Sequence, residues 1–74
     1  MKKVYTVSDG KYSVVVYWDS DFREYVAKIF EYLGLTRDES FKRHDKDTDY
    51  FTDDKTDAID TADAMLKNCL SVDY

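Results

Sequence analysis

The sequence predicts an α+β fold, in which a small antiparallel β-sheet of two to three strands packs against a C-terminal α-helix. Two patterns support this fold class: an Asp-Gly dipeptide between segments of β-forming residues, and an apolar stripe at helical spacing near the C-terminus. The 74 residues suffice for one domain, and the hydrophobic content of 43% suffices for one small core. We therefore expect residues 1–74 to form a single domain.

A β-hairpin is predicted at the N-terminus. Residues 2–8 are rich in β-formers, and Asp9-Gly10 supplies a turn that needs a positive φ. Residues 11–18 then return as the second strand, whose side chains alternate between two faces. The two predicted faces are Tyr12, Val14, Val16 and Trp18 on one side, and Ser13, Val15 and Tyr17 on the other.

Residues 20–33 fit two structures. As a helix, this segment has a capping-box pattern in Asp21 and Glu24, and Gly34 suits its end. As a strand, residues 19–22 form a turn and residues 23–32 return as a third strand. Periodicity alone favours a second helix at 21–33. The helical stripe would consist of Phe22, Tyr25, Val26, Ile29, Phe30 and Leu33.

The clearest element after the hairpin is a helix over residues 53–70. Residues 34–48 are polar and predict a surface loop with a short strand around Phe41, and residues 50–52 predict a brief extended segment. Thr52 or Asp54 can cap the helix. Its apolar stripe consists of Ala58, Ile59, Ala62, Met65, Leu66 and Cys69.

Aspartate is the outstanding candidate for function. Residues 45–63 contain eight aspartates against Lys46 and Lys55, a stronger acidic excess than in the whole chain, whose net charge is −5. Four of them are expected on the solvent side of the helix, and three on one face of the preceding extended segment, about 6.6 Å apart. The eight candidate partner-binding residues are Asp45, Asp47, Asp49, Asp53, Asp54, Asp57, Asp60 and Asp63.

These aspartates have three interpretations. They form a solvated face that keeps the protein soluble, they bind basic groups of a partner protein, or they bind calcium. A merely solvated helix face would favour Glu, the better helix former, so the choice of Asp favours the partner. The calcium pattern that starts at Asp45 lacks two defining residues, because Tyr50 replaces the glycine and Thr56 replaces the bidentate Glu.

Catalysis is not expected. His44 and Cys69 are single residues of their types, which is too few for an ordinary zinc site, and no spacing links them as nucleophile and base. The only glycines, Gly10 and Gly34, do not form a phosphate-binding loop. We expect a non-enzymatic protein without a metal or cofactor.

Charge and hydropathy also limit the partners. Nucleic-acid binders carry a basic stripe, which this chain lacks, so we expect no direct contact with nucleic acid. No apolar run approaches the roughly 20 residues that span a bilayer, and we expect no membrane contact. A single cysteine and no apolar signal-peptide core are typical of a cytoplasmic protein. Tyr17 and Trp18 are further candidate contact residues, toward a partner or a twin subunit, in a monomer or a homodimer.

Two segments resemble small phage and prophage proteins. They are YWDSDFREYV at residues 17–26 and a strand-to-helix pattern, DYFTDDK.DA..TA, that begins at Asp49 and ends at Ala62. The resemblance covers about half of the chain and implies three antiparallel strands with one helix, so it selects the strand for residues 20–33. It also implies a phage or mobile-element origin.

Short acidic phage proteins without catalytic residues are similar in kind to anti-CRISPR proteins and other DNA mimics. This similarity implies an inhibitor that binds a basic, nucleic-acid-binding surface of a Cas effector or a comparable complex in the host cytoplasm. The alternatives are a small accessory or structural phage protein, dimeric through its sheet, and a calcium-binding module.

Overall fold

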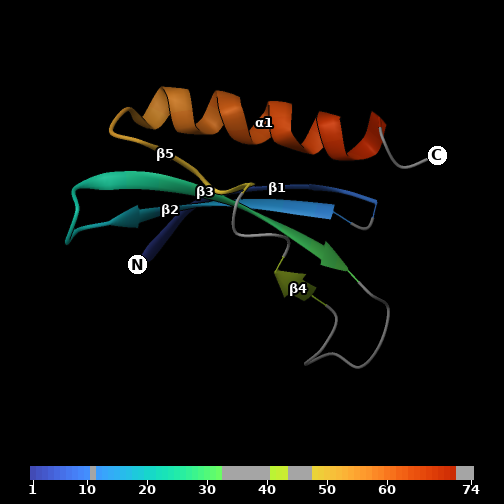
Figure 1. Cartoon of the computed structure of the whole chain (residues 1–74), viewed down its shortest axis with the longest axis horizontal. Coiled ribbons are helices and arrows are strands. Elements are labelled where there is room, and N and C mark those ends of the chain that lie inside the picture. The colour runs from blue at the N-terminus through green and yellow to red at the C-terminus, as the bar shows by residue number, and fades with distance from the viewer. Residues whose placement is uncertain (11, 33–40, 44–47, 72–74) are drawn as a thin grey trace.

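The sheet and the C-terminal helix are both present, so the predicted α+β fold is confirmed. The computed structural model describes residues 1–10, 12–32, 41–43 and 48–71. Figure 1 shows the helix lying across one face of the sheet. In chain order the elements are β1 (Lys2–Asp9), β2 (Tyr12–Asp19), β3 (Glu24–Tyr32), β4 (Phe41–Arg43), β5 (Tyr50–Thr52) and α1 (Lys55–Ser71).

The sheet is antiparallel, with the order β1-β2-β3-β4 and with β5 also paired to β3. The two short strands share the outer edge of β3, because β5 pairs with Tyr25–Ala27 and β4 with Phe30–Tyr32. The predicted two to three strands were therefore too few. The short strands were expected as isolated extended segments, since a three-residue run has too little alternation to reveal its pairing.

The N-terminal hairpin is confirmed, and it contains one irregularity. Gly10 has φ = 60°, as the turn requires. Lys3 pairs with Tyr17, but Tyr5 pairs with Val16, so Val4 is an extra residue in β1. Such a β-bulge changes the face on which the following side chains lie. As a result, Lys3 lies on the face away from α1, and Tyr5 lies on the face under α1.

The helical alternative for residues 21–33 is wrong, because β3 occupies most of this segment. A turn leads into the strand: the Asp21 amide donates to Asp19 Oδ1 at 3.0 Å, and Arg23 adopts φ = 54°. The apolar residues of this segment also fit a helical period, because both faces of the strand carry apolar side chains. The face toward α1 holds Tyr25, Ala27 and Ile29, and the opposite face holds Val26, Lys28 and Phe30.

The core lies between the sheet and α1. Ala58 and Ala62 have no exposed surface, and Leu66 is also buried, which confirms the central part of the predicted helical stripe. Ile59 and Met65 are half-buried, and the Cys69 side chain lies outside the described part. Small alanine side chains let the helix backbone approach the sheet closely. The core residues are Val14, Val16, Ala27, Ile29, Ala58, Ala62 and Leu66.

Enlarging a contact alanine should push the helix away from the sheet. We predict that Ala62→Leu lowers the free energy of unfolding by about 1–3 kcal/mol, because overpacking strains the core. Ala64→Leu is the matched control, since Ala64 is exposed on the same helix and should change the value by less than about 0.5 kcal/mol. Urea denaturation followed by circular dichroism measures both, and equal stabilities would contradict the close contact.

Candidate functional site

The structure describes six of the eight predicted aspartates. Asp45 and Asp47 lie outside the described residues, as does His44. The predicted row that these two form with Asp49 is therefore not described. The six described aspartates are Asp49, Asp53, Asp54, Asp57, Asp60 and Asp63.

Asp49 is neutralised inside the protein. Its side chain is only 5% exposed, and Oδ2 lies 3.6 Å from Nζ of Lys28, which is 14% exposed. A buried carboxylate of this kind needs an opposite charge beside it. Asp49 is therefore not available to bind a partner, and its ion partner is a lysine on the face of β3 away from the helix.

Asp54 begins the helix. Its Oδ1 accepts hydrogen bonds from the amides of Thr56 at 2.9 Å and Asp57 at 3.2 Å, while its carbonyl accepts from Ala58 at 3.0 Å. This is the geometry of an N-cap. Thr52 supports the cap, because its Oγ1 accepts from the Asp54 amide at 3.2 Å. Of the two predicted caps, Asp54 does the capping.

One row of cross-strand partners connects the sheet to the helix. Tyr5, Val16, Ala27 and Tyr50 pair successively across β1, β2, β3 and β5. Val16 and Ala27, in the middle of the row, have no exposed surface and belong to the core under α1. The outer members are tyrosines, which are long enough to extend past the helix on either side.

Both tyrosines bind helix aspartates. Tyr5 Oη donates to Asp63 Oδ1 at 2.8 Å, and Tyr50 Oη donates to Asp57 Oδ2 at 2.6 Å. Asp57 and Asp63 are six residues apart, so at about 100° per residue they leave the helix on different flanks. We call these two contacts the tyrosine clamps. They hold α1 to the sheet from its two sides.

The clamps change the pKa of Tyr5, Tyr50 and Asp57. The hydrogen bond to Asp63 raises the pKa of Tyr5 above its usual 10.0, and the hydrogen bond to Asp57 does the same for the pKa of Tyr50. Donation from Tyr50, followed by donation from Thr52, lowers the pKa of Asp57 below 3.8. Asp57 therefore stays ionised at neutral pH while it is held in a fixed orientation.

The prediction that the helix aspartates simply face solvent is thus corrected. Asp57 and Asp63 are half-buried and clamped. Asp53 and Asp60 are exposed and form no hydrogen bond or ion pair with another described residue. The spacing of the aspartates predicted the correct side of the helix but gave no sign of the tyrosine partners. Tyr5 is 58 positions away from Asp63, and Tyr50 reaches Asp57 only because β5 pairs with β3.

The candidate aromatics do not form one patch. Trp18 lies on the helix side of the sheet and packs on Tyr25, with ring centroids 4.7 Å apart and planes inclined at 53°. Tyr17 lies on the opposite face. Three exposed aromatics were missed: Phe22, 75% exposed in the turn before β3, and, in β5, Phe51 at 57% and Tyr50 at 36%. Their signal in the sequence was an aromatic residue inside a polar or acidic segment.

Among the described residues, no three His, Cys, Asp or Glu side chains are grouped to hold a metal ion. Within the same part of the chain, no helix has the length and apolar character needed to cross a membrane. No family model, curated protein or solved structure matches the chain. The resemblance to phage proteins therefore stays a prediction.

Removing a clamp hydroxyl should loosen the helix. We predict that Tyr5→Phe and Tyr50→Phe each lower the thermal unfolding midpoint by a few degrees, because each loses one hydrogen bond and keeps the ring. Tyr17→Phe is the control, since its hydroxyl has no partner among the described residues. Differential scanning calorimetry measures the midpoints. A clamp variant as stable as Tyr17→Phe would refute the clamp.

The clamps should also give stability a defined dependence on pH. The raised pKa of Tyr5 and Tyr50 means that their contribution is complete below pH 10.0 and is lost as the pH rises through the folded-state value. The lowered pKa of Asp57 means that its contribution is complete above pH 3.8 and is lost as the pH falls.

The double variant Tyr5→Phe/Tyr50→Phe should therefore lose part of the alkaline decline in stability, whereas Tyr17→Phe should retain it. Thermal midpoints recorded from acidic to strongly alkaline pH measure this difference. An alkaline decline that is identical in the double variant and the parent protein would contradict the titration assigned to the clamps.

Proposed function

We propose that the protein is a non-enzymatic inhibitor that binds a basic, nucleic-acid-binding surface of a defence complex, in the manner of an anti-CRISPR protein. The contact would involve the β5–α1 surface, which we define as the outer side of α1 and the adjoining strand β5. Its members are Tyr50, Asp53, Asp57 and Asp60.

The observation that carries this proposal is the combination of available carboxylates with an exposed ring. Asp53 and Asp60 are exposed and have no described partner. Tyr50 is 36% exposed and pairs with Ala27, so its ring stands on the helix side of the sheet, next to Asp57. Interface hot spots commonly combine an aromatic anchor with surrounding polar groups.

The clamp at Tyr50 supports the same surface. Asp57 is ionised and oriented by its hydrogen bond, so it presents a fixed negative charge beside the freely exposed ones. Preorganised charge reduces the entropy lost on binding. The acidic net charge of −5 would steer the protein toward a basic groove. Asp49 and Asp54 have structural roles and are left out of the proposed contact.

The decisive experiment expresses the chain in cells with an active CRISPR–Cas system and scores phage plating. We predict that Asp53→Lys/Asp60→Lys abolishes inhibition and weakens binding to the purified effector by about tenfold or more, with binding of the parent falling steeply as salt rises. Asp9→Lys/Asp21→Lys is the matched control, because both residues are exposed at the two hairpin turns and change the net charge equally.

Equal inhibition by the two double variants would refute the acidic contact. An absence of inhibition by the parent protein, together with a solution mass of twice 8.7 kDa, would favour the accessory phage protein that is dimeric through its sheet. Replacing Phe51 by Ala is a further control: Phe51 pairs with Val26 and so lies on the face of the sheet away from α1, and this variant should leave binding unchanged.

A further inference from the structure

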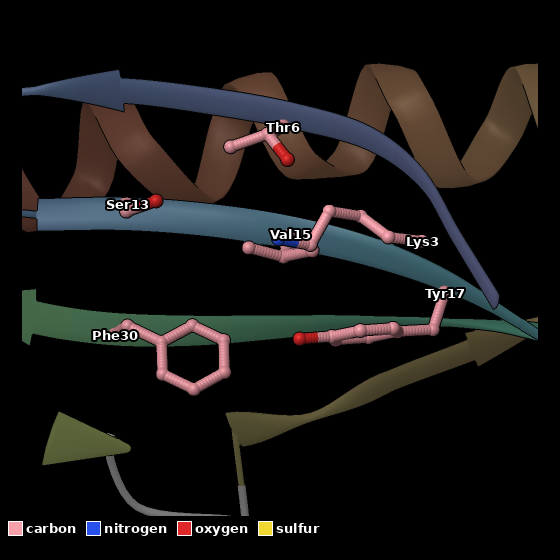
Figure 2. A pocket seen from close by; sticks show the side chains of 6 residues that line it. All are labelled: Lys3, Thr6, Ser13, Val15, Tyr17 and Phe30. Carbon is pink, nitrogen blue, oxygen red and sulfur yellow. The ribbon is translucent and has the colours of Figure 1, made fainter. Parts of the chain in front are cut away.

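The face of the sheet away from α1 contains a cavity of about 330 Å³ (Figure 2). The registers of β1, β2 and β3 explain its shape. Val15 forms its base, with Thr6 beside it on β1, while Ser13 and Tyr17 stand at either end of Val15 along β2. Phe30 belongs to β3 and closes the side opposite β1. The lining residues are Lys3, Thr6, Ser13, Val15, Tyr17 and Phe30.

The walls of the cavity are mainly apolar and aromatic. Val15 is 6% exposed, and the rings of Tyr17 and Phe30 are half-buried. In Figure 2 both rings project over β3 on the same side of the sheet. Such a lining favours a flat apolar group, because rings bury a large area and can stack on one another.

Ser13 supplies a polar group inside this apolar lining. Its side chain is 6% exposed, and its hydroxyl has no hydrogen-bond partner among the described residues. Within that part of the chain, no polar side-chain atom is both fully shielded and unpaired. The Ser13 hydroxyl therefore opens onto the cavity, where it can bond only to water or to a ligand.

Lys3 supplies a positive charge at the mouth of the cavity. Its side chain is exposed and forms no ion pair with a described residue. In Figure 2 its ammonium group lies over Val15. Lys28 belongs to the same face, but Asp49 already neutralises it. The free charge among the lining residues is thus positive, although the whole chain is acidic.

We propose that this cavity binds a small planar aromatic ring that carries an anionic group, either a carboxylate or a phosphate. The ring would lie on Val15 between Tyr17 and Phe30, Lys3 would neutralise the anion, and Ser13 would accept or donate one hydrogen bond. The volume is at the lower end for ligand sites, which fits one ring or a fused pair. The proposal does not rest on the β5–α1 surface, because Asp53 and Asp60 take no part in it.

Titrations followed by amide NMR of the labelled full chain test the proposal. The carboxylate probe is indole-3-acetate with the neutral control indole-3-acetamide, and the phosphate probe is AMP with adenosine. We expect saturable shift changes confined to the lining residues, and tighter binding of an anionic probe than of its neutral control by about three- to fivefold. The probe that saturates at lower concentration identifies the anion, and an absence of saturable shifts with all four would overturn the proposal.

Matched variants separate the three contacts. Lys3→Gln should weaken the anionic probe about three- to fivefold and leave the neutral one unchanged. Lys2→Gln is its control, because Lys2 makes the same charge change but pairs with Trp18 and does not line the cavity. Ser13→Ala should weaken both probes, whereas Ser8→Ala, at its cross-strand partner, should not. Equal effects of the Lys3 and Lys2 variants would refute the anion site.

A filling variant tests the position of the ring. Thr6 is exposed at the rim, so Thr6→Trp can occupy the cavity without enlarging the core between the sheet and the helix. We expect it to keep a well-dispersed amide spectrum and to lose binding of every probe. Undiminished binding by this folded variant would place the ligand elsewhere and overturn the site.

Discussion

The structure depends on the close approach of α1 to the sheet. Ala58 and Ala62 of the helix belong to one core with Val16 and Ala27 of the sheet, and all four side chains have no exposed surface. Small side chains on both sides bring the two layers together. Only at this separation can tyrosines that arise from the sheet reach carboxylates on the flanks of the helix. The clamps are therefore a consequence of the alanines, not an independent feature.

The aspartates of residues 49–63 fall into two groups: those with contacts inside the protein and those without. Asp54 caps the helix, Asp49 balances a lysine, and Asp57 and Asp63 accept the tyrosine hydroxyls. A domain of this size buries only about 60% of its unfolded surface, so polar contacts at the margin of the core make a meaningful contribution. Of the described aspartates between residues 49 and 63, Asp53 and Asp60 have no such internal contact, which confines the acidic binding surface to a narrower region than composition suggests.

Local patterns could be predicted from the sequence, and long-range partners could not. The hairpin follows from Asp9-Gly10, and the cap at Asp54 follows from amides two and three residues away. The strand β3 was ambiguous because Val26 and Phe30 make its second face apolar as well. The Tyr5 clamp and the ion pair of Asp49 join different segments of the chain, so neither spacing nor periodicity contains a signal for them. The Tyr50 clamp spans only seven residues, but it depends on the pairing of β5 with β3, which the short strand does not reveal in the sequence.

The single extra residue in β1 sets two separate surfaces at once. Because side chains alternate along a strand, Val4 allows Tyr5 to point toward the helix while Lys3 points to the opposite face. If β1 ran without this irregularity, Val4 would take the place opposite Tyr17, and Lys3 would move opposite Trp18, on the helix side of the sheet. The cavity would then have a valine at its mouth and lose its positive charge, while Tyr5 would keep its place under the helix. One unpaired residue thus gives the first strand two chemically different sides within three positions.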